Sequence, residues 1–140
     1  MTDVQQTLVL IKPDAVSRGL VGAVLSRYET KGLAIEQLQL RRIDAAFADR
    51  HYAEHVDQPW YPGLRDFITS GPLVAVVLSG ERAIEAVRVL NGATDGVKAS
   101  PGSIRGDFAS SNQRNIVHAS DTVESAEREI GLWFPEGVSE

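Results

Sequence analysis

Short apolar runs predict the strands of this chain. Such runs occupy residues 7–11, 73–79 and 116–119. The first two, TLVLI and LVAVVLS, are almost continuously apolar, as expected of strands that are covered on both faces. A fourth stretch, residues 33–42 (LAIEQLQLRR), alternates between apolar and polar positions instead. Its phase slips between Ile35 and Leu38, which predicts a β-bulge in this strand.

Apolar residues at helical spacing predict the helices. These lie in residues 20–31, 45–56, 63–70, 81–91 and 121–134. Gly32 and Gly92 follow the first and the fourth of them, and glycine commonly ends a helix because it adopts the left-handed conformation without strain. At the start of the last helix, Asp121 and Thr122 are both candidate N-caps, and Asp121 with Glu124 has the spacing of a capping box.

The segment between the fourth helix and the last strand has no regular pattern. Residues 92–115 contain scattered apolar side chains among many turn formers. A loop this long in a small domain is usually functional or disordered, and we favour a functional loop because Ile104 and Phe108 are able to anchor it. The predicted order is β-α-β-α-α-β-α-loop-β-α. It contains the split βαβ repeat of an α/β (α+β) fold, the ferredoxin-like sandwich, in which a four-stranded antiparallel sheet carries helices on one face.

Composition narrows the classes of protein that fit this chain. With 140 residues, of which 43% are hydrophobic, residues 1–140 are expected to form a single domain. The formal charge of −5 argues against general nucleic-acid binding, which needs a basic surface. The absence of cysteine fits a reducing compartment. The N-terminal apolar run has no charged leader and is too short to span a bilayer, so we expect a soluble cytoplasmic protein with no membrane association.

His118 is the first candidate for chemistry, because it stands at a strand end just before a helix start. A neutral imidazole there can attack an electrophile and form a covalent intermediate, and the N–H groups of the helix start attract an anion. The ordinary alternative is a partly buried histidine satisfied by the helix cap. A nucleophilic histidine also needs an acceptor on its other ring nitrogen. Glu127 and Glu129 flank the apolar face of the last helix on opposite sides, and periodicity does not choose between them.

Four cations are candidate ligands of an anion: Lys12, Arg88, Arg105 and Arg114. Arginine suits phosphate because its planar fork donates two hydrogen bonds at once. The ordinary alternatives are ion pairs, of Arg88 with Glu85 and of Arg105 with Asp107. The chain has no G-x-x-x-x-G-K-[ST] motif, so a nucleotide phosphate would be held differently from that in a P-loop protein.

Aromatic and histidine residues add two weaker candidates. Trp60 and Tyr61 lie where two short helices meet, and an aromatic ring there can stack on a nucleobase, although packing between helices is its ordinary role. His51 and His55 have the i, i+4 spacing of metal ligands. Because no third ligand or H-E-x-x-H arrangement accompanies them, we do not predict a metal at this pair.

Five motifs, in this order and spacing, resemble the nucleoside diphosphate kinase family: TLVLIKPDAV, RHYAEH, TSGP, RGDF and NIVHASD. The resemblance extends over about residues 7–134, and the combination of IKPD, RGDF and N-x-x-H-x-S-D is highly specific. It implies a ping-pong enzyme that maintains nucleoside triphosphate pools. Such an enzyme transfers the γ-phosphate of ATP, or of another nucleoside triphosphate, to nucleoside diphosphates.

The resemblance also implies roles for single residues. His118 is the nucleophile that becomes phosphohistidine, Glu129 orients its imidazole, and Ser120 supports Glu129 and the transferring group. Lys12 is placed with them among the catalytic residues. The implied substrate-binding residues are Lys12, Tyr52, Trp60, Leu64, Arg88, Thr94, Arg105, Asn112 and Asn115.

Within that set, the resemblance implies a division of labour. Lys12 and Asn115 contact the sugar hydroxyls, and Trp60 stacks on the base. The phosphates are reached by Arg88, Thr94 and Arg105. Mg²⁺ arrives with the nucleotide phosphates rather than in a protein cage. The family also implies a homo-oligomer, commonly a tetramer or a hexamer.

Three positions depart from the family pattern. Ala119 replaces the glycine that usually follows the histidine, and its Cβ would slow the reaction if the backbone there needs a positive φ or a close approach. Trp60 stands where phenylalanine is common, which preserves the stacking surface. Asn112 makes the other side of the base pocket more polar. Two other functions stay open: a module that binds a nucleotide without turning it over, and a carrier that receives its phosphoryl group from a protein.

Overall fold

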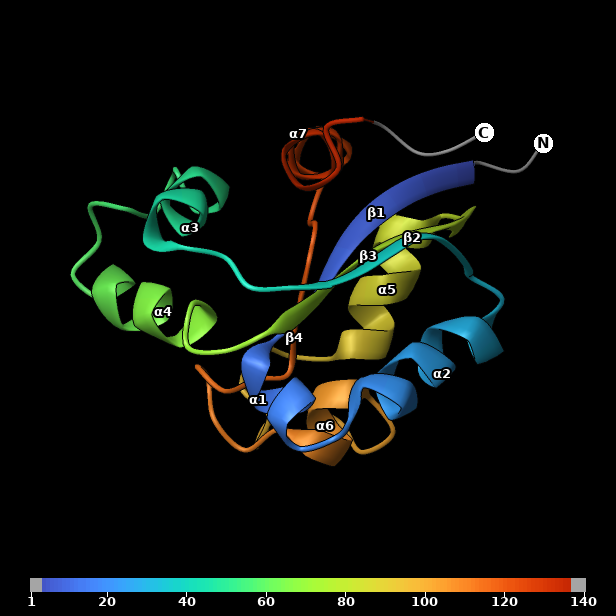
Figure 1. Ribbon diagram of the computed structural model, residues 1–140. Coiled ribbons are helices and arrows are strands. Elements are labelled where there is room, and N and C mark those ends of the chain that lie inside the picture. Colours follow the sequence, from blue (N-terminus) through green and yellow to red (C-terminus); the bar gives the residue numbers. More distant parts are fainter. Residues whose placement is uncertain (1–3, 137–140) are drawn as a thin grey trace.

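The structure, a computed structural model, describes residues 4–136 (Figure 1). The strands are β1 (Val4–Ile11), β2 (Ala34–Arg41), β3 (Leu73–Glu81) and β4 (Val117–Ala119). The helices are α1 (Pro13–Ser17), α2 (Val21–Lys31), α3 (Ala45–His51), α4 (Tyr61–Ile68), α5 (Ala83–Asn91), α6 (Ile104–Phe108) and α7 (Val123–Trp133). Every predicted strand and helix is present, although α3 ends earlier than its pattern predicts.

The strands form one antiparallel sheet in the order β2-β3-β1-β4, which confirms the predicted four-stranded arrangement. The register of β2 against β3 shifts between Ile35 and Gln37, and this confirms the predicted bulge. β4 is a short edge strand that pairs only with β1. This pairing sets His118 opposite Leu10, near the end of β1.

Helices cover both faces of the sheet, so the expectation of helices on one face is wrong. The helices of the split βαβ repeat, α2 and α5, pack with α6 on one face, and α3, α4 and α7 cover the other (Figure 1). Side chains alternate between the two faces of a strand, so Leu8 belongs to one core cluster and Val9 to the other. Both are 0% exposed. This double burial explains why β1 and β3 are apolar at nearly every position.

Two short helices, α1 and α6, have no counterpart in the prediction. α1 begins at Pro13, whose fixed φ suits the first position of a helix. α6 lies inside the irregular segment 92–115, where Ile104 is 0% exposed and anchors it. The Ser103 Oγ caps this helix by accepting from the Gly106 N–H at 3.0 Å. None of the helices within residues 4–136 has the length and apolar character needed to cross a membrane.

The start of α7 differs in detail from its prediction. Thr122 is the N-cap, and its Oγ1 accepts from the Ser125 N–H at 3.0 Å. Asp121 does not cap the helix, so the predicted capping box of Asp121 with Glu124 is wrong. The shorter threonine side chain satisfies the orphan N–H group, and the aspartate is left outside the helix.

Candidate active site

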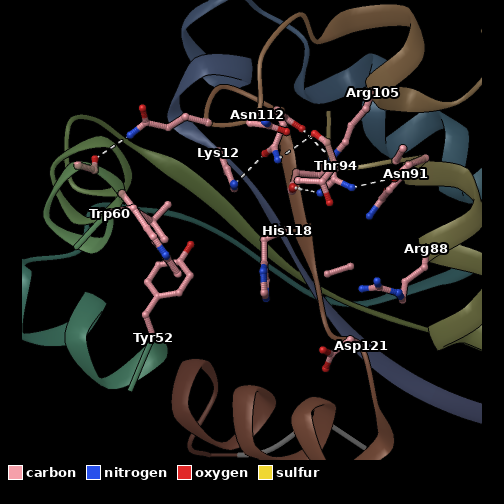
Figure 2. Close-up of a pocket in the computed structure, with 18 residues that line it drawn as sticks. Lys12, Tyr52, Trp60, Arg88, Asn91, Thr94, Arg105, Asn112, His118 and Asp121 are labelled. Carbon is pink, nitrogen blue, oxygen red and sulfur yellow. Dashed lines mark hydrogen bonds between the residues drawn. The ribbon is translucent and has the colours of Figure 1, made fainter. Parts of the chain in front are cut away.

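A cavity of about 640 Å³ opens where β1 and β4 meet the segment 92–115. All of the predicted substrate-binding residues line it, together with His118. They are Lys12, Tyr52, Trp60, Leu64, Arg88, Thr94, Arg105, Asn112 and Asn115. Figure 2 shows Trp60 and Tyr52 on one side of His118, Arg88 on the opposite side, and Lys12, Thr94 and Arg105 along a third. The fold thus brings to one pocket residues that the sequence separates by more than a hundred positions.

His118 lies in the middle of β4 and is partly buried. Its Nε2 is 3.2 Å from the Glu129 Oε1, and the Ser120 Oγ donates to the same oxygen at 2.7 Å. A carboxylate only accepts hydrogen bonds, so the ring proton is on Nε2, and Nδ1 keeps its lone pair. Glu127 lines a different hollow, with residues of β1. The structure therefore sets Glu129, and not Glu127, against the imidazole.

The chain enters β4 through a strained turn. Ile116 has a φ of 76°, which β-branched residues rarely adopt. The Val117 N–H donates to the Asn115 carbonyl at 2.8 Å and closes a γ-turn around Ile116. The Ile116 N–H donates to the Asp14 Oδ2 at 3.1 Å, and its carbonyl accepts from the Lys12 N–H at 2.8 Å. Strain of this kind persists only where the surroundings enforce it, and here these bonds hold both flanks of the turn at the cavity.

Lys12 and Asn115 form a buried pair at this corner of the cavity. The Lys12 Nζ donates to the Asn115 Oδ1 at 2.8 Å, and the Asn115 Nδ2 donates to the Thr94 carbonyl at 3.4 Å. Burial, followed by the charge of Arg105, lowers the pKa of Lys12 to about 8, although Asp14 opposes the shift. The ammonium is therefore charged at neutral pH and loses its charge in mildly alkaline solution.

Arg105 holds the loop and still has donors to offer. Its Nε, Nη1 and Nη2 donate to the carbonyls of Asn115 at 3.1 Å, Gly92 at 2.9 Å and Val117 at 2.7 Å. A guanidinium has five N–H groups, so two remain for a ligand. Asp107, its alternative partner, binds Arg27 at 2.8 Å instead. Burial lowers the pKa of Arg105, but a guanidinium remains protonated in proteins.

Arg88 is an exposed residue of α5 that lines the cavity. Glu85, its alternative partner, pairs with Arg82. Within residues 4–136 no carboxylate pairs with Arg88, so its planar fork is available to an anion. Arg114 lies outside the cavity, in a separate hollow with two other arginines.

Trp60, Leu64 and Tyr52 form the apolar wall of the cavity. Trp60 is 53% exposed, whereas the neighbouring Tyr61 is buried and donates to the Asp49 Oδ1 at 2.7 Å. The tryptophan is therefore the aromatic side chain that presents a free surface here. Burial raises the pKa of Tyr52 above its ordinary value, so its hydroxyl remains protonated and able to donate.

Three polar lining residues are missing from the prediction: Asn91, Gln113 and Asp121. Asn91 is buried and accepts from the Tyr28 hydroxyl at 2.6 Å. The Gln113 Nε2 donates to the Gly63 carbonyl at 2.8 Å and so ties the loop to α4. The sequence offers Asp121 as a helix cap, and only the structure, in which Thr122 caps α7, leaves its carboxylate free to face the cavity. Nothing in the sequence distinguishes the other two.

The remaining expectations concern Ala119 and the two histidines before the aromatic wall. Ala119 is extended, lies opposite Val9, and is not among the residues with positive φ, so the first of the two conditions under which its Cβ would slow the reaction is not met. The ring of His55 packs on Trp60, with 5.3 Å between centroids. His51 instead lies against His118, with 4.8 Å between centroids. The pair therefore splits between two different neighbours.

Comparison with known proteins identifies the relatives of this chain. The family model described as nucleoside diphosphate kinase matches residues 5–138. The nucleoside diphosphate kinase of a Nocardioides species is 68% identical, and the alignment covers 93% of this chain and 96% of that protein. The nucleoside diphosphate kinase of Cutibacterium acnes is 58% identical, with 96% and 98% covered.

Solved structures of nucleoside diphosphate kinases are also similar to this chain. The halophilic nucleoside diphosphate kinase from Halobacterium salinarum, in complex with CDP, superposes with a TM-score of 0.94 at 45% identity, over 99% of this chain and 93% of that one. The nucleoside diphosphate kinase of Aquifex aeolicus gives a TM-score of 0.92 at 40% identity, over 94% and 96% of the two chains.

Proposed function

The chain belongs to the nucleoside diphosphate kinase family, and from this premise we propose which of its residues carry out the reaction. The enzyme transfers the γ-phosphate of a nucleoside triphosphate to a nucleoside diphosphate by a ping-pong mechanism through a phosphohistidine. We assign the nucleophile to His118 and the nucleotide site to the cavity above it. The assignment depends on one observation: His118 is oriented by Glu129 and faces a cavity lined with cations.

In the first half-reaction, the Nδ1 lone pair of His118 attacks the γ-phosphorus in line with the bridging oxygen. The P–O bond breaks, the nucleoside diphosphate leaves with the electron pair, and the imidazole carries the phosphoryl group. Glu129 accepts from Nε2 and stabilises the positive charge that develops on the ring, while Ser120 holds the carboxylate. In the second half-reaction, a terminal phosphate oxygen of another diphosphate attacks the same phosphorus and restores the neutral ring.

Phosphoryl transfer needs placement and charge neutralisation more than acid–base catalysis. We assign the phosphates to Arg88, Arg105 and Thr94, because the two arginines have free donors and line the cavity. Lys12 and Asn115, already paired at one corner, are assigned to the sugar hydroxyls.

A nucleotide kinase of this kind acts with a divalent metal ion. We assign this role to Mg²⁺ that enters bound to the nucleotide phosphates. Among the described residues that line the cavity, Asp121 is the one carboxylate. Mg²⁺ prefers an octahedron of oxygen ligands and retains several waters, so this lining supports a metal held by the nucleotide and not by a protein cage.

The base is assigned to the wall formed by Trp60 and Leu64, with Tyr52 and Asn112 beside it. An aromatic face reads the shape of a ring and not its hydrogen-bonding edge, so it accepts all of the common bases. The Halobacterium salinarum relative was solved with CDP, which supports a nucleoside diphosphate as the occupant of this cavity.

The proposal extends to assembly and location. We assign a homo-oligomer, a tetramer or a hexamer, because β2 is an edge strand that exposes Leu38 at 49% and Leu40 at 66%. We assign residues 1–140 to a single domain. The match of one family model to residues 5–138 supports this assignment. The cytoplasm, where nucleotides are abundant, is the assigned location.

The test is phosphorylation by γ-labelled ATP with Mg²⁺, followed by addition of GDP. We expect an acid-labile, base-stable label on the protein and its discharge as GTP. His118→Asn should be silent in both steps, and the matched variant His55→Asn should be labelled like the wild type. Nucleotide binding without any label would instead favour a binding module. Label that GDP does not discharge would favour a carrier with a protein donor.

A further inference from the structure

His51 is a buried polar residue that the reaction described above does not use. It ends α3, is 3% exposed, and meets the His118 ring edge to face with 79° between the planes. Its Nδ1 lies 3.0 Å from the Trp133 Nε1. Its Nε2 is buried and has no hydrogen-bond partner among the described residues. Buried polar atoms are nearly always paired in native structures, so an unpaired one beside a nucleophile requires an explanation.

Trp133 fixes the tautomer of His51. An indole N–H only donates, so the His51 Nδ1 must accept and cannot carry a proton. A doubly protonated ring would set two N–H groups against each other at this contact. The pKa of His51 is also well below its ordinary value. Burial is the largest cause, and the charges of His118, Arg128, Lys12 and His55 add to it. The ring is therefore neutral, and its one proton is on Nε2.

The tautomer of His51 decides whether a metal ion can bind to a cluster that His51 forms with His118 and Glu129. Each of these three residues offers one possible ligand atom, and the three atoms lie within 4.8 Å of one another. Two histidines with a glutamate are a common ligand set for zinc. A metal needs an imidazole lone pair, but the lone pair of His51 is on Nδ1 and faces Trp133. A metal bound here would also occupy the imidazole assigned as the nucleophile. The hydrogen bond from Trp133 thus occupies the one lone pair that His51 could offer to a metal.

We propose that His51 is a positioning residue: its ring, whose tautomer is fixed by Trp133, packs edge to face against the His118 imidazole, orients that imidazole and denies the cluster to transition metals. The inference rests on the assignment of His118 as nucleophile. One hydrogen bond, from Nε2 to Glu129, leaves the imidazole free to pivot about that contact. The edge-to-face packing of His51 restricts this pivot and keeps Nδ1 in line with the incoming phosphorus.

A single helix supplies both restraints on the nucleophile. Glu129 and Trp133 are four residues apart in α7 and therefore share a face. Arg128 of the same helix donates to the His51 carbonyl at 2.8 Å, so α7 also fixes the end of α3. His51 is consequently held from its ring and from its backbone.

Two matched substitutions separate the nitrogens of His51. His51→Asn keeps an acceptor near Nδ1 and loses the donor near Nε2, whereas His51→Gln does the reverse. We expect the single-turnover rate of labelling by γ-labelled ATP to fall about tenfold in His51→Asn and to stay within about threefold of wild type in His51→Gln. The ATP concentration for half-maximal rate should be unchanged in both. The proposal is overturned if His51→Asn is labelled as fast as His51→Gln, or faster. If the wild type carries no label on His118, the assignment of the nucleophile itself is rejected.

The metal part of the proposal has its own test. In Trp133→Phe the imidazole proton of His51 can move from Nε2 to Nδ1, and the Nε2 lone pair then becomes available to a metal. We expect this variant to bind Zn²⁺ at least about tenfold more tightly than the wild type in calorimetry without nucleotide, with loss of labelling that a chelator reverses. Adding His51→Gln to Trp133→Phe should abolish the gain. Equal Zn²⁺ affinity of Trp133→Phe and wild type overturns the tautomer assignment, and this test stands even if a His51 variant fails to fold.

Discussion

At the scale of the single residue, we expect Lys12 to couple nucleotide binding to pH. Because its pKa is about 8, the ammonium is mostly charged at pH 7.5 and mostly neutral at pH 9. We expect the dissociation constant of ADP to rise by up to about eightfold over this range if, as we propose, the protonated lysine is the form that binds the nucleotide. Lys12→Gln should bind more weakly at every pH and show no such rise. Isothermal titration calorimetry measures both, and a pH-independent affinity of the wild type would contradict the expectation.

Single residues also show where sequence reasoning stops. The spacing of α7 leaves Glu127 and Glu129 equivalent, and the choice between them depends on which flank of the helix packs beneath β4. The positive φ of Ile116 has no signal in the sequence, because nothing about an isoleucine suggests a γ-turn. Motifs therefore name the residues of the pocket, while tertiary packing decides the bonds between them.

At the scale of the element, periodicity finds the long helices and misses the five-residue ones. A helix as short as α1 or α6 completes little more than one turn, so its apolar face cannot repeat. α6 matters most for the site, because it carries Arg105. Its capping serine is a local signal, and its Asp107 carboxylate accepts hydrogen bonds from the Gly102 N–H and from the distant Arg27; only the structure connects these interactions.

Gly106 tests how strictly α6 is held. A Cβ at this position would collide with the Ser100 carbonyl and lie 2.8 Å from the Ser103 Oγ, which caps the helix. We expect Gly106→Ala to lower the free energy of unfolding by about 1–3 kcal/mol and to raise the KM for ATP, because Arg105 moves with the helix. Urea denaturation and steady-state kinetics measure the two effects.

Gly131 provides the matched control for this substitution. It lies inside α7, and a Cβ there meets nothing within 4 Å. We expect Gly131→Ala to stabilise the protein by about 0.5–1 kcal/mol with an unchanged KM for ATP. If the two alanine variants proved equally stable, the close approach of α6 to Ser100 would not be a constraint.

At the scale of the whole molecule, the exposed edge of the sheet is the feature that bears on assembly. Leu40 is 66% exposed on the edge strand β2. We expect Leu40→Glu to reduce the molar mass in light scattering, because a charge in a subunit contact is costly to bury. Val89→Glu, at an apolar position of α5 that is 71% exposed, is the control and should leave the mass unchanged. A full-sized oligomer of Leu40→Glu would remove β2 from the assigned interface.

The order of elements anticipates the sheet but not the second layer of helices. A split βαβ repeat accounts for α2 and α5, and the expectation of an open face follows from that repeat alone. The apolar runs of β1 and β3 already argue for two covered faces, and they describe the molecule better than the topology does. The packing of α7 on the second face then places Glu129 and Trp133 under the site.

The edge position of β4 separates the candidate nucleophile from the side chains that would contact the nucleobase. Because β4 pairs with β1 alone, the sheet and α7 supply His118 and its carboxylate, while Trp60 at the start of α4, Leu64 of α4 and Asn112 supply the surfaces that a nucleobase would meet. Trp60 and Asn112 both line this outer part of the cavity. An engineer who wished to retarget the catalyst to an unnatural base can therefore exchange the side chains at positions 60, 64 and 112 and leave the reactive atom untouched.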